Sequence, residues 1–257
     1  MMNSIISYSR NQMAEIPGGV IDLRDDRIKK DWRVSIEPFL VSKCPVTVEL
    51  YHAVTHNTPY VFDSVQKPVV NVSWNDAIAF CNLLSREAGL KECYSRSKET
   101  EDVGVGDNRG IGSIRGIRNV GGDGEDNGDR GAVICDWEAG GFRLPTEAEW
   151  EYACKAGTTG YRYAEIDRIA WYHGNSDDEI HPVGLKEPNA WGLYDMLGNV
   201  WEWCWDVYDV EKYGSYRIFR GGGWAEEERG CGATSRRRAH PTFLIDDLGF
   251  RVVRSLV

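Results

Sequence analysis

The chain has 257 residues, of which 42% are hydrophobic and 27% are charged. This composition is typical of a globular protein, and the length suits one large domain or two small ones. The formal net charge of −10 argues against a general nucleic-acid binder, because such a protein needs a basic face for the phosphates. We therefore expect no nucleic-acid partner.

Neither export nor membrane insertion is indicated by the sequence. Residues 1–10 lack the charged start and long apolar run of a secretory signal peptide. No stretch approaches the roughly 18 consecutive apolar residues that a membrane-spanning helix requires. The seven cysteines are odd in number and widely scattered, so we expect reduced thiols. We thus expect a cytoplasmic protein without a membrane span.

The first elements predicted along the chain are extended segments and a short helix. Residues 13–21 predict two extended segments around a Pro-Gly-Gly turn. Residues 34–41 alternate between apolar and polar as a strand does. Pro45 then predicts the start of a helix that runs to about Thr55, since proline is favoured in a first helical turn.

Two further helices are indicated by their capping residues. Ser73 is a suitable N-cap for an amphipathic helix over residues 74–88, and Gly89 supplies its end. Thr146 followed by Glu149 forms a capping box, which predicts another helix start.

Residues 95–131 differ from the rest of the chain. They are rich in Gly, Asp, Asn and Arg, and their apolar residues are too sparse to bury a face. We expect a long, mobile surface loop. A plain insertion and a segment that closes over a ligand are the two alternatives.

The stretch 192–203 combines two glycines, an amide, two carboxylates and three aromatic residues. It follows neither a helical nor an alternating period. Irregular backbone of this kind is held by packing, by an ion, or by both. An aromatic corner of the core with two turn glycines is the simpler alternative.

Six segments of the chain carry motifs that are modest alone and specific together: residues 16–19, 71–74, 141–151, 192–203, 220–224 and 248–251. Their order resembles the formylglycine-generating enzyme (sulfatase-modifying factor) family. The resemblance runs from about residue 13 to residue 254, around the insertion at 95–131, and implies one domain over residues 1–257. The implied fold is α+β, a variant of the C-type-lectin-like fold with small twisted antiparallel sheets, many loops and two main helices. These helices would be those at about 46–55 and at 74–88 or 146–156.

The resemblance further implies a Cu(I) site made of two cysteines close to the Arg-Gly-Gly sequence that begins at Arg220. The second family cysteine falls on Cys231, but the first falls on Glu226. A carboxylate is a hard ligand and replaces a thiolate poorly on Cu(I). We therefore expect no copper and no formylglycine-generating activity. Cys231 is expected to be a small buried residue, and it is the catalytic candidate only if the protein is an enzyme.

A calcium ion is also implied by the resemblance, at the stretch 192–203. The matching ligands are the carboxylates of Asp195 and Glu202 and the backbone carbonyls of Gly198 and Val200. Oxygen ligands of mixed origin suit calcium, and we expect its role to be structural. The alternative is that Glu202 accepts backbone hydrogen bonds in the same loop.

The last third of the chain carries a patterned run of charges, which is either a solvated face or a binding surface. For the binding surface we predict Trp224, Glu226, Glu228, Arg236 and Arg238, because arginine clusters bind carboxylates and phosphates and indole rings offer flat contacts.

Two hypotheses of function follow. The first is a non-catalytic module that binds a protein, peptide or glycan ligand, as in the retroelement-diversified variable proteins that use such scaffolds. The second is a divergent oxidoreductase that modifies a protein or peptide thiol.

Overall fold

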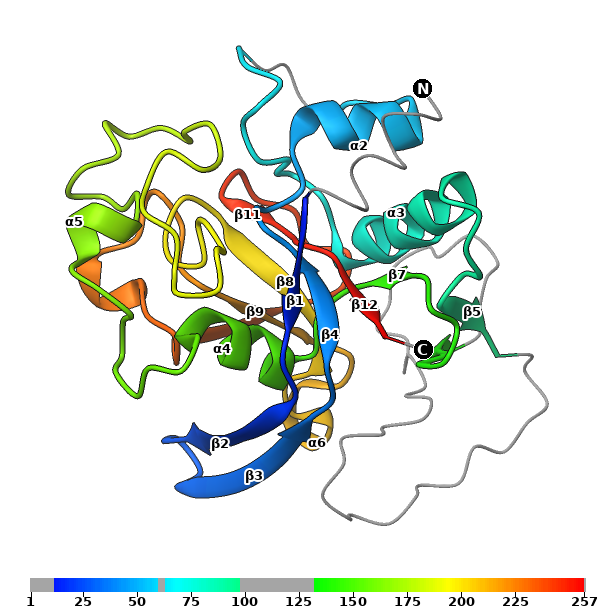
Figure 1. Ribbon diagram of the computed structural model, residues 1–257, viewed down its shortest axis with the longest axis horizontal. Helices are drawn as coiled ribbons and strands as arrows, with labels where there is room; N and C mark the ends of the chain where they lie inside the picture. Colours follow the sequence, from blue (N-terminus) through cyan, green and yellow to red (C-terminus); the bar gives the residue numbers. More distant parts are fainter. Residues whose placement is uncertain (1–11, 60–62, 98–131, 257) are drawn as a thin grey trace.

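The computed structural model describes residues 12–59, 63–97 and 132–256. Two four-stranded sheets, two two-stranded sheets and several helices make up these parts of the chain (Figure 1). The strands are β1 (Met13–Ile16), β2 (Gly19–Asp25), β3 (Lys30–Ile36), β4 (Phe39–Ser42), β5 (Tyr94–Arg96), β6 (Val133–Cys135), β7 (Phe142–Arg143), β8 (Trp201–Val207), β9 (Arg217–Arg220), β10 (Arg236–Ala239), β11 (Leu248–Gly249) and β12 (Val253–Ser255). The helices are α2 (Val48–Thr55), α3 (Trp74–Glu87), α4 (Glu147–Lys155), α5 (Ile166–Ile169), α6 (Val210–Tyr213) and the 3-10 turn η1 (Glu228–Gly230).

The first four-stranded sheet joins the two ends of the described chain. Its order is β1-β4-β12-β7, and each neighbouring pair is antiparallel. The β2–β3 hairpin projects from the body beyond β1 and β4 (Figure 1). Because β1 pairs with β4 and β4 with β12, the first and last strands stabilise each other.

The second four-stranded sheet has the order β10-β9-β8-β11, with β11 parallel to β8. Neighbouring residues of a strand point to opposite faces. Trp203 therefore lies beside Phe219 on one face, within the hydrophobic cluster that contains α3. On the other face, Glu202 lies beside Arg220 in register, towards α4. The sheet thus separates an aromatic core from a face that carries buried charges.

Helix starts predicted from the capping residues are confirmed. Ser73 caps α3 through a capping box with Asp76, and Thr146 caps α4 through a capping box with Glu149. Each box satisfies backbone N–H groups that the first turn leaves without partners. Helix α2 also forms, with Thr47 as its N-cap. The structure thus has three helices of eight or more residues in its described part, rather than two.

Two other expectations need correction. Residues 34–41 are not one strand, because β3 ends at Ile36 and β4 begins after Pro38, which has no N–H to donate to a sheet. The loop predicted from residue 95 begins later, since Ser95 and Arg96 belong to strand β5, which pairs with β6. Residues 98–131 lie outside the described residues.

The mixed α+β class with small sheets is confirmed. Among the helices of the described residues, none has the length and apolar character needed to cross a membrane.

Candidate functional site

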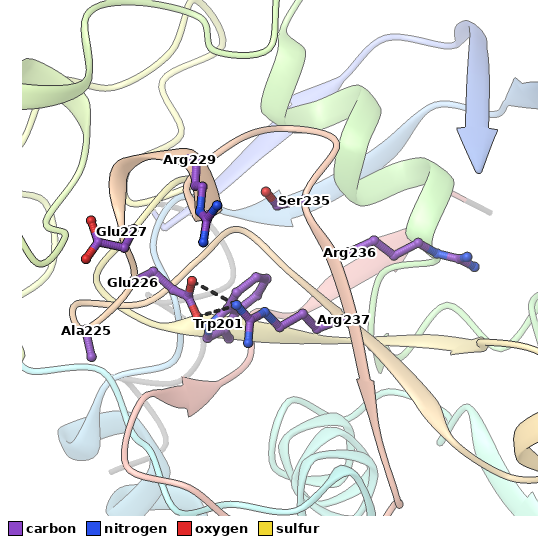
Figure 2. Close-up of a pocket in the computed structure, with 9 residues that line it drawn as sticks. Trp201, Ala225, Glu226, Glu227, Arg229, Ser235, Arg236 and Arg237 are labelled. Carbon is purple, nitrogen blue, oxygen red and sulfur yellow. Dashed lines mark hydrogen bonds and ion pairs between the residues drawn. The ribbon is translucent and has the colours of Figure 1, made fainter. Parts of the chain in front are cut away.

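A cavity of about 520 Å³ opens on the second sheet, where the starts of β8 and β10 meet the turn that precedes Cys231. Its wall combines an aromatic ring with acidic, basic and hydroxyl side chains (Figure 2). Pockets of such size and mixed chemistry are where proteins bind small groups or side chains. The lining residues are Trp201, Ala225, Glu226, Glu227, Arg229, Gly230, Ser235, Arg236 and Arg237.

An ion pair crosses this cavity. Arg237 Nη2 lies 2.8 Å from Glu226 Oε1 and donates a hydrogen bond of 2.9 Å to Oε2. The Arg237 guanidinium also lies over the Trp201 ring, 5.2 Å from its centroid. Figure 2 shows Arg229 reaching towards the same place from the opposite wall. The pair therefore covers the indole ring inside the pocket.

Alternation along β10 decides which arginines face this cavity. Arg236 is part of the wall, but its guanidinium turns away, donating to Glu147 at 2.6 Å and to Asp25 at 2.8 Å (Figure 2). Arg238 turns to the same side as Arg236 and lies 3.8 Å from the centroid of the Tyr213 ring. Arg237 alone among the three points into the pocket. The predicted pair Arg236 and Arg238 therefore places its charges on the other face of the strand.

Trp224 and Glu228, also predicted as ligand-binding residues, do not line the cavity. The backbone N–H of Trp224 donates a hydrogen bond of 2.9 Å to the Asn199 carbonyl, which connects this segment to the stretch 192–203. Glu228 accepts a hydrogen bond of 2.8 Å from Arg162.

Of the five predicted residues, only Glu226 brings its charged group into the pocket. Arg229, Ser235 and Arg237 were missed. Strand alternation over residues 236–239 separates Arg237 from Arg236 and Arg238, but the sequence does not say which of the two faces holds the pocket.

Asp247 lies beneath the pocket. Its backbone carbonyl accepts a hydrogen bond of 2.7 Å from the backbone N–H of Trp201, where β8 and β11 begin. Burial raises the pKa of the Asp247 carboxyl to about 6, and the nearby carboxylates of Asp246 and Glu226 act in the same direction. Burial and the neighbouring carboxylates thus make ionisation of Asp247 unfavourable next to the pocket.

Cys231 is fully buried and does not line the cavity. A Cβ atom added at Gly222, whose φ is +89°, would lie 2.6 Å from the Cys231 sulfur, so the Gly-Gly sequence is what lets the thiol pack here. Burial raises the pKa of the Cys231 thiol to about 12, and the Glu226 carboxylate adds to that shift. The thiol is therefore protonated and shielded at neutral pH.

The stretch 192–203 is held by another ion pair. Both oxygens of Glu202 accept hydrogen bonds from Arg251, at 2.6 and 2.7 Å, and Oε2 also accepts from the Trp150 indole at 2.7 Å. Asp195, whose carboxylate accepts the Gly184 N–H at 2.7 Å, lies next to this pair. Burial raises the pKa of the Asp195 carboxyl to about 6.

This arrangement does not fit a calcium ion on Glu202, because a guanidinium already occupies the oxygens that would coordinate the metal. The described residues contain no cluster of three or more His, Cys, Asp or Glu side chains that could hold a metal ion. Nor does Glu202 accept a backbone N–H, which was the alternative. The predicted calcium ligands Asp195, Gly198, Val200 and Glu202 are therefore not assigned a metal ion, and calcium binding by the chain stays a prediction.

Comparisons with known proteins show the family of the chain. A family model described as a sulfatase-modifying factor enzyme 1-like domain matches residues 5–256. The chain belongs to this family. It is 31% identical over 249 residues to the chaperone protein LppX of Paenibacillus barcinonensis, a match that covers 88% of this chain and 83% of that protein.

Two more relatives are similar to the chain in structure or in sequence. The solved structure of Treponema denticola variable protein 1 superposes with a TM-score of 0.76 at 33% identity, and covers 94% of each chain. The formylglycine-generating enzyme of Streptomyces coelicolor is 34% identical over 144 residues, which are 43% of this chain and 46% of that enzyme. The chain spans less than half the length of several further curated relatives. The fold is thus that of the family, a C-type-lectin-like variant, as the resemblance implied.

Proposed function

We propose that this domain is a non-catalytic binding module whose ligand site is the pocket formed around Trp201, Glu226 and Arg237. The observation that carries the proposal is the state of Glu226. This residue stands where the family resemblance places the first copper cysteine, and its carboxylate is bound to Arg237. A group engaged with a guanidinium and made of hard oxygen atoms does not serve Cu(I).

The second family cysteine supports the same conclusion. Cys231 is buried beneath the Gly-Gly turn, and the raised pKa of its thiol keeps it protonated at neutral pH. Nucleophilic and metal-binding chemistry both require the thiolate. With Glu226 at the position of one thiol, Cys231 is the one soft ligand left of the pair that the oxidase reaction requires.

The surface around the pocket supports ligand binding. The cavity volume of about 520 Å³ lies inside the range of roughly 300–1,000 Å³ that is usual for ligand pockets. The relative with a TM-score of 0.76 is called a variable protein, which favours a scaffold that presents its surface to a partner. We propose a protein, peptide or glycan ligand at this C-terminal surface.

Arrays of peptides and glycans would test the proposal. Binding would be compared between the parent protein and the double variant Glu226→Gln/Arg237→Gln, with Arg24→Gln as a control because Arg24 is exposed on the β2–β3 hairpin, outside the pocket. Ligands that bind the parent and the control but not the double variant are the expected result. An array in which no ligand depends on the pocket pair would contradict the proposal.

A further inference from the structure

We infer that the pocket recognises an arginine side chain of a protein partner, and that Arg237 occupies the place of that side chain in the free protein. The inference rests on the proposed binding function and names the ligand class of the same site. Its basis is a cage for a guanidinium group that the chain fills with its own residue (Figure 2).

The cage has one carboxylate and one ring. Both oxygens of Glu226 lie within 2.9 Å of Arg237 Nη2, and the Trp201 ring lies against the guanidinium with 5.2 Å between the ring centroid and Cζ. The carboxylate makes one charge-assisted hydrogen bond and an ion pair to a single guanidinium nitrogen, and the indole adds a cation–π contact; both kinds of contact favour a guanidinium. A guanidinium from another molecule would find the same partners.

Arg237 is held weakly enough to be exchanged. Its side chain is 55% exposed, whereas Glu226 is 17% exposed. It stands on β10, which is an edge strand of the second sheet, so nothing in the described part of the sheet covers its outer side. Among the described residues, Glu226 is the ion-pair partner found for Arg237. The exposed Arg237 side chain can be solvated when it moves outward, whereas Glu226 is mostly buried and keeps its need for a cationic partner.

The charges that remain when Arg237 moves out favour a cation. Glu226 faces the cavity and Asp247 lies close to Glu226, whereas Arg229 is the cation left on the wall that points inward; Glu227 is part of the wall, but its carboxylate points away from the pair in Figure 2. An arriving guanidinium would be attracted to this excess of carboxylates. An anionic ligand would meet the same carboxylates and be repelled.

The neighbouring surface suits a protein rather than a small free cation. Phe243, Leu244 and Ile245 are consecutive exposed apolar residues that precede Asp247 in the loop between β10 and β11. The Asp247 carbonyl accepts the backbone N–H of Trp201, so this loop ends next to a residue of the pocket, although its three apolar side chains are not part of the pocket wall. Residues beside an incoming arginine could bury these side chains.

Short peptides with one central residue changed would test the inference directly. The probes are an acetylated, amidated Gly-Arg-Gly peptide, the same peptide with citrulline, which has the same shape without the charge, and the same peptide with glutamate. Binding would be followed by calorimetry and by NMR of the Trp201 indole N–H, in the parent, Arg237→Ala and Arg237→Ala/Glu226→Gln proteins at one ionic strength.

The expected result is a gain of affinity on removing the internal occupant. Arg237→Ala should bind the arginine peptide at least about 5-fold more tightly than the parent, because binding no longer displaces a resident side chain. The citrulline and glutamate peptides should show no such gain. In the Arg237→Ala background, Glu226→Gln should weaken binding of the arginine peptide about 10-fold or more, because its carboxylate is the counter-charge. Circular dichroism and melting temperature would check that each variant is folded.

Two results would overturn the inference. One is an arginine peptide that binds Arg237→Ala no more tightly than it binds the parent, or binds neither. The other is a glutamate peptide that binds the parent more tightly than the arginine peptide, which would assign the pocket to anions through Arg229 and Arg237. In either case the array experiment decides the proposed function separately, because a ligand of another class that depends on the pocket would leave that function standing.

Discussion

Two of the glutamate–arginine pairs in this domain have surroundings that differ completely. In the Glu202–Arg251 pair the side chains are 1% and 0% exposed. Arg251 also donates to the carbonyls of Ser42 and Tyr194, both at 3.0 Å. In the pair formed by Glu226 and Arg237, the Arg237 side chain is 55% exposed and has one carboxylate partner in the described residues.

The difference separates scaffold from site. Arg251 stands just before β12 and bonds to β4, to the stretch 192–203 and to β8, so it fixes the irregular backbone that supports the pocket. Breaking such a buried pair leaves a charge without a partner or solvent. The pocket pair is solvated and can open without that cost. The same chemical groups therefore stabilise the fold in the Glu202–Arg251 pair, whereas in the pocket they allow one guanidinium to replace another.

The largest expected effect comes from Glu202→Gln. Removal of the carboxylate leaves the Arg251 guanidinium buried without its counter-charge, and we expect the free energy of unfolding to fall by about 3–5 kcal/mol. Urea titration would measure it, with Glu227→Gln as the control because Glu227 is exposed on the pocket rim.

The same variant also tests calcium. If the ion pair is what matters, the loss in Glu202→Gln should be equal with calcium and with a chelator. A loss seen only when calcium is present would instead restore Glu202 as a calcium ligand.

A second, smaller effect is expected from Arg236→Gln on the strand that carries the pocket arginine. Arg236 donates to Asp25 and Glu147, both of which are buried, so its removal leaves charged acceptors with fewer donors. We expect a loss of about 2 kcal/mol in the free energy of unfolding, measured by urea titration. A loss under about 0.5 kcal/mol would show that the buried side of β10 is no more stabilising than an exposed face.

The pH dependence of stability should reveal Asp247. Because its pKa is raised to about 6 in the folded protein, ionisation of this carboxyl opposes folding, and its contribution is lost as pH rises through that value. Asp247→Asn should therefore be more stable than the parent by about 1 kcal/mol at pH 7.5, with the difference vanishing near pH 4. Thermal melts at the two pH values would show it. A variant that is less stable than the parent at pH 7.5 would contradict the assignment.

The smallest stability effect is expected at the pocket itself. Arg237→Gln should change the free energy of unfolding by less than about 0.5 kcal/mol, because the pair is solvated and screened by salt. A matched comparison with Arg236→Gln, one residue away, makes this prediction sharp. If Arg237→Gln costs as much as Arg236→Gln, the pocket pair belongs to the scaffold and the contrast between the two pairs fails.

Much of the fold followed from local residues and from the family resemblance. Ser73 and Thr146 predicted helix starts because capping is a short-range interaction. The role of Glu202 did not follow, because its partner Arg251 is 49 residues away and no local pattern announces the pair. Arg237 was missed for a different reason: Arg236 and Arg238 were predicted, and a strand places these two on the face opposite to that of Arg237.

Oxygen consumption in the presence of Cu(I) and a cysteine-containing peptide tests the account most directly. It would be measured for the parent, for Cys231→Ser and for Glu226→Cys, which restores a cysteine at the first family position. We predict that the parent consumes no oxygen in a copper-dependent way, that the peptide keeps its thiol, and that Cys231→Ser behaves as the parent does. Copper-dependent loss of the peptide thiol by the parent, abolished in Cys231→Ser, would contradict a binding module and identify an oxidase.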